Sequence, residues 1–146
     1  MAHIIKTALV TFSAEQMYDL VEDVKAYPDF LPWCHGSEVR EIHENEVSAS
    51  VEFSMGGVTQ SFTTRNTLQQ PEKIQVCLEE GPFETLEGVW HFQALSDSAC
   101  KISLDLQFSF ANRLLEMAIG PVFHQIASTL VDSFCQRAEV IYNHED

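Results

Sequence analysis

The residues best suited to nucleophilic or metal chemistry are spread along the chain without a catalytic spacing. Cys34 and His35 are adjacent, but neighbouring side chains in extended backbone point to opposite sides, so they do not form a thiol–imidazole pair. The six histidines show no spacing that would put two metal ligands on one predicted helix. The sequence also contains no phosphate-binding glycine loop, H-E-x-x-H or G-x-S-x-G motif. We therefore predict no catalytic residue, no metal, no cofactor and no enzymatic activity.

Large apolar side chains form the alternative candidate site. They recur on one face of the predicted strands and of the C-terminal helix, where they would either fill a core or line a cavity. An aromatic-lined cavity with few polar groups suits an apolar ligand, because each buried CH₂ contributes about 0.8 kcal/mol. The candidate lining residues are Phe62, Phe83, Leu86, Trp90, Phe92, Leu104, Phe108, Leu115, Ile119, Phe123 and Ile126.

Two further features extend this candidate site. Strand parity places Asn66 on the Phe62 face, where its amide would either hydrogen-bond a ligand carbonyl or be satisfied within the core. A compact proline-containing loop carries Phe30, Leu31 and Trp33. Two interpretations of this loop stay open: a gate or membrane-touching tip, or a plug that packs on the C-terminal helix.

Hydrophobic periodicity indicates the elements that must position these residues. Ser13 stands three residues before Gln16, a capping-box spacing that predicts a helix over 14–24. Asn112 is a good N-cap for an amphipathic helix of about 30 residues. Alternating apolar residues predict strands at 3–12, 38–43, 46–55, 58–68, 74–78, 86–94 and 101–110.

This order of elements predicts an α+β fold in which a curved antiparallel sheet of six or seven strands is covered by the long C-terminal helix. The gap between a curved sheet and one helix is uneven, so a pocket is expected there. A length of 146 residues fits a single domain, which we assign to residues 1–146.

Charge and composition limit the partners. Eight Lys and Arg against 22 Asp and Glu give a net charge of −14, and the eight bases are scattered. Nucleic acids and anionic lipid surfaces are bound through basic patches, so we predict no DNA partner and at most transient membrane contact. The sequence shows no run of 18–20 apolar residues and no leader pattern, and its four cysteines are far apart. We therefore expect reduced thiols and a cytoplasmic location.

Four segments in the same order resemble the signatures of one family, which comprises coenzyme Q-binding START-like proteins and the bacterial ribosome association toxin RatA, grouped with polyketide cyclase-like domains. The likeness runs over essentially the whole chain. The segments are Tyr27-Pro28-x-Phe30-Leu31-Pro32-x-Cys34, Phe62-x-Thr64-Arg65-Asn66, Gly81-Pro82-Phe83-x-x-Leu86-x-Gly88-x-Trp90-x-Phe92 and Phe134-x-x-Arg137-Ala138-x-x-x-Tyr142.

The resemblance implies a START-like helix-grip fold with a hydrophobic cavity, and two different activities. Mitochondrial members bind ubiquinone for respiration, whereas bacterial relatives bind the large ribosomal subunit and block subunit association. Because the predicted curved sheet and helix have an aromatic lining and no catalytic constellation, we predict binding of ubiquinone or a polyprenyl lipid that supports respiration. A charge of −14 argues against contact with ribosomal RNA. The alternative is a RatA-type translation inhibitor. The absence of a mitochondrial transit-peptide pattern indicates the bacterial branch. The likeness to polyketide cyclases concerns the fold, and a shared fold does not imply catalysis.

Overall fold

A computed structural model describes residues 2–142. Most predicted elements are present, and a 3₁₀ helix and a short α-helix are added between α1 and the second strand. The elements are β1 (Ala2–Val10), α1 (Ala14–Glu22), η1 (Val24–Ala26), α2 (Tyr27–Phe30), β2 (Cys34–His43), β3 (Glu46–Met55), β4 (Val58–Gln69), β5 (Lys73–Glu80), β6 (Phe83–Ser96), β7 (Ala99–Phe110) and α3 (Arg113–Tyr142).

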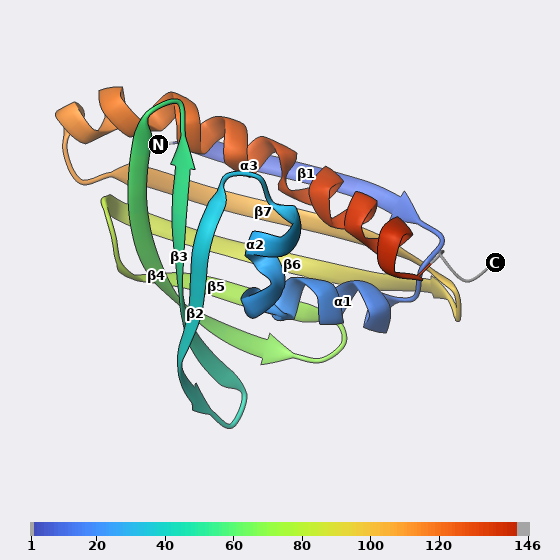
Figure 1. The fold of residues 1–146 in the computed structure, drawn as a ribbon. Helices are drawn as coiled ribbons and strands as arrows, with labels where there is room; N and C mark the ends of the chain where they lie inside the picture. Colours follow the sequence, from blue (N-terminus) through green and yellow to red (C-terminus); the bar gives the residue numbers. More distant parts are fainter. Residues whose placement is uncertain (1, 143–146) are drawn as a thin grey trace.

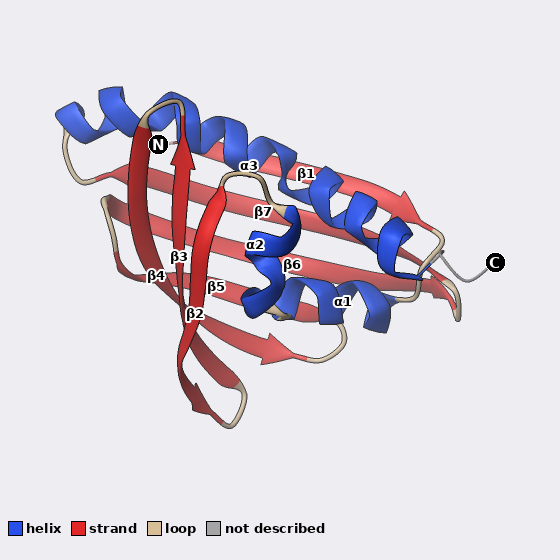
Figure 2. Ribbon diagram, in the orientation of Figure 1, coloured by secondary structure: helices blue, strands red, loops and turns tan. Residues whose placement is uncertain are grey.

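Seven antiparallel strands form one sheet in the order β1-β7-β6-β5-β4-β3-β2. Strands β2 to β6 each pair with the next strand along the chain, and β1 forms the edge of the sheet beside β7. The sheet bends strongly, so that β2–β4 run steeply across the direction of β1, β6 and β7, and α3 lies along its concave side (Figures 1 and 2). The predicted α+β helix-grip architecture is confirmed.

Local sequence explains the sharpest turn and the start of the long helix. Gly56 and Gly57 have φ values of 61° and 83°, and two positive φ angles produce the turn that matches the twist of a two-residue hairpin. The Asn112 side-chain oxygen accepts a hydrogen bond of 2.8 Å from the Leu115 amide. This bond satisfies one of the free N–H groups at the beginning of α3.

Most predicted boundaries shift by up to three residues, and two regions differ more. β2 begins at Cys34 rather than at residue 38, with an irregular register between Cys34 and Gly36, because backbone pairing with β3 continues where the apolar alternation has stopped. The proline-containing loop is helical over 24–30, and Pro28 sits in the first turn of α2. A proline is tolerated there because the first N–H groups of a helix have no intrahelical partner.

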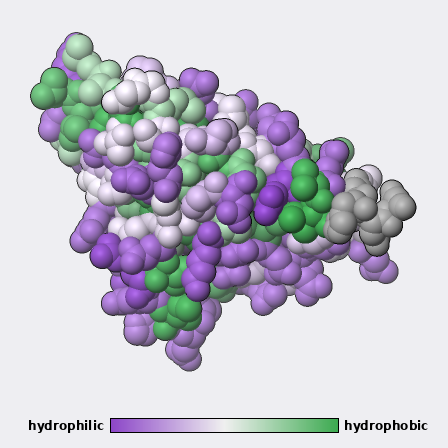
Figure 3. Space-filling view, in the orientation of Figure 1, coloured by the Kyte–Doolittle hydropathy of each residue, from purple (hydrophilic) through white to green (hydrophobic). Residues whose placement is uncertain are grey.

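One face of α3 packs against the sheet and supplies much of the core. By length and composition α3 is apolar enough to cross a membrane, a property it shares with core helices of globular domains. At its first turns Leu114 and Met117 stay exposed. The beginning of α3 lies at the upper left in Figure 1, where Figure 3 shows a hydrophobic surface area. The buried residues of α3 are Ile119, Phe123, Ile126, Ala127, Val131, Phe134 and Ala138.

Candidate functional site

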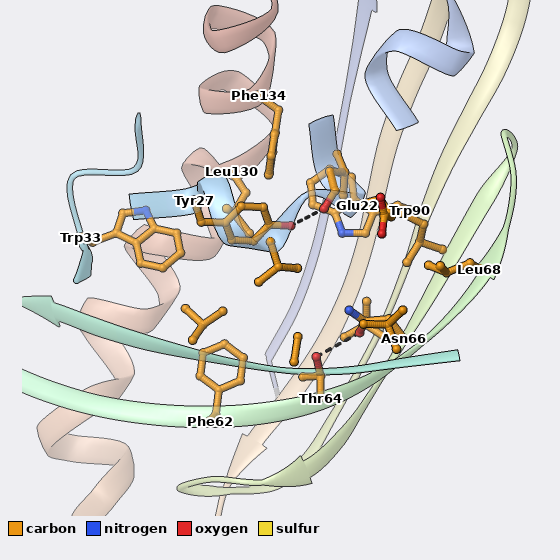
Figure 4. A pocket seen from close by; sticks show the side chains of 17 residues that line it. Glu22, Tyr27, Trp33, Phe62, Thr64, Asn66, Leu68, Trp90, Leu130 and Phe134 are labelled. Atoms are coloured by element: carbon orange, nitrogen blue, oxygen red, sulfur yellow. Dashed lines mark hydrogen bonds between the residues drawn. The ribbon is translucent and has the colours of Figure 1, made fainter. Parts of the chain in front are cut away.

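Two small cavities lie on the inner face of the sheet. The loop-side cavity, about 120 Å³, is enclosed by β3–β5 and by the segment from α1 to α2 (Figure 4). The helix-side cavity, about 100 Å³, lies between β5–β7 and α3. The two adjoin, because five residues line both: Trp33, Phe62, Val76, Trp90 and Leu130.

The strand register explains why the sheet is hollow at this point. One inner-face row runs across four strands through Asn66, Val76, Gly88 and Leu106. Gly88 contributes no side chain, and a Cβ atom built there would lie 2.9 Å from Leu106 Cδ1. The middle of the row therefore has no side chain to fill the space under α3, and the helix-side cavity lies over Gly88.

Polar groups are few and belong to the loop-side cavity. The Asn66 side-chain oxygen accepts a hydrogen bond of 3.0 Å from the Thr64 hydroxyl, and in Figure 4 its amide nitrogen lies on the cavity side. The Tyr27 hydroxyl donates to the Val21 carbonyl, and burial raises the Tyr27 pKa well above its usual range. The cavity therefore offers one amide donor within mostly apolar walls.

Glu22 and Trp33 add two less ordinary groups. Burial, followed by the charges of Asp23 and Asp19, raises the pKa of Glu22, whose side chain lines the loop-side cavity. The Trp33 Nε1–H is buried and has no hydrogen-bond partner within residues 2–142. A buried donor without a partner costs about 1–3 kcal/mol, so the Trp33 Nε1–H is a free hydrogen-bond donor next to the cavities.

Reactive groups do not converge on these cavities. Their walls contain no His, Cys or Lys side chain among the described residues, and no group of three His, Cys, Asp or Glu within residues 2–142 could hold a metal ion. All four cysteines are free thiols. Burial raises the pKa of Cys34 and Cys100, and that of Cys135 to about 11. The cavities are suited to binding an apolar group.

The structure divides the predicted lining residues into two sets. The residues that line a cavity are Trp33, Phe62, Asn66, Leu86, Trp90, Leu104, Phe123 and Ile126. The residues that line neither cavity are Phe30, Leu31, Phe83, Phe92, Phe108, Leu115 and Ile119. The second set packs away from the two cavities, for two physical reasons.

Aromatic packing fills the space near the beginning of α3. Phe123 lies 4.8 Å from Phe83 and 4.9 Å from Phe108 between ring centroids, which leaves no room beside them. Ile119, one turn earlier on α3, is 1 % exposed. Leu115, at the start of the helix, is half-buried against the same core.

At the other end, helices close the gap. The Phe30 ring lies 5.4 Å from Phe134 and is covered by the Arg137 guanidinium at 5.0 Å, while Leu31 is fully buried. Phe92 packs edge-to-face on Tyr18 of α1. The loop therefore packs against α3 as in the second of the two interpretations, and of its three predicted residues Trp33 is the one that reaches the cavities.

Sequence reasoning missed several lining residues. Leu130 and Phe134 share the periodic apolar face of α3, and Val76 shares the parity of its strand, so the pattern contained their signal. Gly88 and Tyr27 were visible only as parts of the family signature. Hydrophobic periodicity does not show that a glycine such as Gly88 leaves a gap in the core, or that a tyrosine in a short helix such as Tyr27 lines a cavity.

Residues 10–135 match the family described as "Polyketide cyclase / dehydrase and lipid transport". The chain belongs to this family. Its curated relatives divide into two groups. "Ribosome association toxin RatA" of Pseudomonas aeruginosa is 49% identical over 140 residues, covering 96% of this chain and 97% of the relative. "Coenzyme Q-binding protein COQ10 homolog B, mitochondrial" of Xenopus laevis is 28% identical over 97% of this chain and 59% of its own length.

Solved structures of polyketide cyclase-like proteins share the fold. A START superfamily protein from Mycobacterium smegmatis superposes with a TM-score of 0.80 at 19% identity, covering 95% of this chain and 98% of that one. The Zhui aromatase/cyclase from Streptomyces sp. R1128 gives 0.79 at 16% identity, covering 98% of each chain. At these identities the likeness shows the helix-grip fold and carries no catalytic role.

Proposed function

We propose that this chain acts as a ribosome association toxin of the RatA type, which binds the large ribosomal subunit and prevents subunit association. The supporting observation is the 49% identity to RatA of Pseudomonas aeruginosa, which extends over 96% of this chain and 97% of the relative. The coenzyme Q-binding relative is much more distant, at 28% identity. A ribosomal partner also implies a cytoplasmic location in a bacterium.

Cavity size gives a geometric reason to rank ubiquinone second. The cavities measure about 120 and 100 Å³, below the roughly 300–1,000 Å³ of typical ligand pockets. A quinone ring with a polyprenyl tail needs more space than this. The −14 charge argued against the ribosomal function in the sequence, but a total charge does not describe the local surface that meets a partner.

A second candidate function is the non-enzymatic binding of a small apolar ring. The observation that favours it is the Asn66 amide in otherwise apolar walls, together with the partnerless Trp33 Nε1–H. A ring that bears a carbonyl oxygen would be recognised by the amide nitrogen of Asn66. The proposed ligand residues are the eight predicted residues that line the cavities.

Ribosome profiles test the first function. Expression of the chain in a bacterium should reduce the 70S peak in a sucrose gradient, increase free subunits, and place the chain in the large-subunit fractions. The control is the same plasmid with an early stop codon. A normal 70S peak with the intact chain at the top of the gradient would contradict the proposal.

Extraction and fluorescence test the second function. The chain has two tryptophans, Trp33 and Trp90, and both line the cavities. Titration with a tail-less quinone should therefore quench tryptophan fluorescence, and Asn66→Leu should weaken binding by about tenfold, the loss expected for one buried hydrogen bond. Unchanged fluorescence at saturating quinone, with no small molecule found by mass spectrometry, would exclude it.

A further inference from the structure

The fold gathers bases that are far apart in the sequence. Lys73 of β5 pairs with His91 of β6, and His91 pairs with Ser103 of β7. Lys101 stands two residues before Ser103 on the same face. Side chains directly opposite each other have Cβ atoms about 5 Å apart, and diagonal neighbours about 7–8 Å. Lys73, His91 and Lys101 therefore form one group, which we name the outer-face cationic cluster.

Burial shows that the outer-face cationic cluster faces away from the core. Ile74, Phe92 and Ile102, the residues that follow Lys73, His91 and Lys101, are 2 %, 2 % and 0 % exposed. Because successive side chains of a strand alternate between faces, the cluster lies on the convex side of the sheet, opposite both cavities. His91 and Lys101 are exposed and Lys73 is half-buried.

A groove of about 580 Å³ adjoins the outer-face cationic cluster. The polar groups that line it include the Ser103 hydroxyl, the Gln93 amide, the His91 ring and the Lys101 ammonium group, and Pro71 and Glu72 line it from the turn that leads into β5. Its lining residues are Ala14, Pro71, Glu72, His91, Phe92, Gln93, Ala94, Lys101 and Ser103. The groove is therefore rich in hydrogen-bond donors and has one carboxylate.

The cluster's lysines are available, whereas arginines elsewhere are engaged. Arg65 bonds to Glu79 and Glu46, and Arg137 covers the Phe30 ring. Within residues 2–142, neither cluster lysine forms an ion pair.

Acidic side chains near the cluster are few. Glu72 lines the groove, and Asp97 lies in the turn between β6 and β7. Asp105, one row along the outer face, is bonded to His3 at 2.7 Å. Beside the one carboxylate of the groove, the outer-face cationic cluster thus presents two lysines that form no ion pair within residues 2–142, on a molecule whose net charge is −14.

We propose that the outer-face cationic cluster contacts the phosphodiester backbone of ribosomal RNA on the large subunit; this inference rests on the proposed function. Lysines, a histidine, a hydroxyl and an amide are the groups that bind phosphate oxygens. A molecule of strong negative charge is repelled by RNA in most orientations, so a face that presents two lysines without ion-pair partners also selects the orientation that approaches. The convex side of the sheet, rather than the cavity, is therefore the ribosome-binding face.

The test is co-sedimentation of the full chain with purified bacterial large subunits between 50 and 200 mM salt. The variant K73Q/K101Q should bind about tenfold more weakly at 100 mM salt, and the slope of log K against log salt should become shallower by about 1.5, since two phosphate contacts are lost. The matched control is K25Q/R113Q. Its two positions are exposed and lie on η1 and at the start of α3, and it carries the same total charge. Thermal melts verify that both variants fold.

The outcomes separate this inference from the proposed function. Loss of binding and a shallower slope in K73Q/K101Q alone support it. If both variants bind large subunits as well as the original chain, the cluster does not touch RNA, while the proposed function stands. Equal losses in both variants indicate a general charge effect and overturn the inference. If the original chain does not bind at all, the proposed function and the inference both fail.

Discussion

The adjacent residues Arg65 and Asn66 of β4 point to opposite faces of the sheet and make different kinds of contact. Asn66 faces the loop-side cavity, whereas Arg65 lies outside, where its Nε donates to Glu79 at 3.0 Å and its Nη1 donates to Glu46 at 3.2 Å. The outward pair belongs to a polar network, since Ser48 also donates to Glu79 at 2.5 Å. At this point on β4, the inner face of the sheet therefore carries core packing and the cavity, and the outer face carries hydrogen bonds and charged groups.

The Glu79 network predicts a pH-dependent contribution to stability. The hydrogen bond from Ser48 and then that from Arg65 lower the pKa of Glu79 below its ordinary value of 4.5. A lowered pKa in the folded state adds stability above the unfolded-state pKa, and this stability is lost as the pH falls through the folded-state pKa. Glu79→Gln should therefore lower Tm at pH 7, with a difference that shrinks steadily from pH 5 to pH 3.

Thermal melts of Glu79→Gln across this pH range check the prediction. Glu84→Gln, an exposed change on β6, is the matched control and should follow the original chain within error. A Tm difference for Glu79→Gln that stays constant down to pH 3 would show that the carboxylate charge does not contribute.

Among the elements, α3 depends on an aromatic contact near its first third. Phe123 is 4 % exposed and meets Phe53, Phe62, Phe83 and Phe108 at centroid distances of 4.8–5.8 Å. Its ring therefore holds the helix against strands from both halves of the bent sheet.

Phe123→Ala should lower the free energy of unfolding by about 3–5 kcal/mol, the usual cost of removing a buried ring. The comparison on the same helix is Leu114→Ala, where the side chain is 76% exposed, and this change should stay within about 0.5 kcal/mol. Urea titrations of both variants measure the difference. A cost below 1 kcal/mol for Phe123→Ala would mean that α3 is held elsewhere.

The turn between β5 and β6 requires glycine at position 81, because of its backbone angle and its close contact with Phe62. Gly81 has a φ of 152°, and a Cβ atom there would lie 2.7 Å from the Phe62 Cβ. Gly57 in the β3–β4 turn also has a positive φ, 83°, but has open space around it. Gly57→Ala should cost about 1–2 kcal/mol from backbone strain alone. Gly81→Ala should cost clearly more in the same urea titrations, and equal costs would show that the contact with Phe62 relaxes freely.

At the scale of the whole molecule, the elements were predictable from the sequence, but the shape of the cavities and of the surface was not. Periodicity located the strands and α3, because each element buries one face. It could not show that Phe83 and Phe108 fill the gap while Gly88 leaves it open, since that depends on register across strands. The same register brings Lys73 and Lys101 to either side of His91, a grouping of two of the eight bases that their spacing in the sequence does not show.

The two candidate functions use opposite faces of the sheet, so a single change should separate them. Val76 lines both cavities, and Val76→Phe would place a ring in the hollow above Gly88. Since space is available there, the free energy of unfolding should change by less than about 1 kcal/mol, whereas overpacking of a filled core costs about 1–3 kcal/mol. Quenching by a tail-less quinone should disappear, while the loss of the 70S peak on expression should persist because the convex face is unaltered. If a folded Val76→Phe variant no longer reduces the 70S peak, the cavity is required for the action on ribosomes, and the separation of the two faces is wrong.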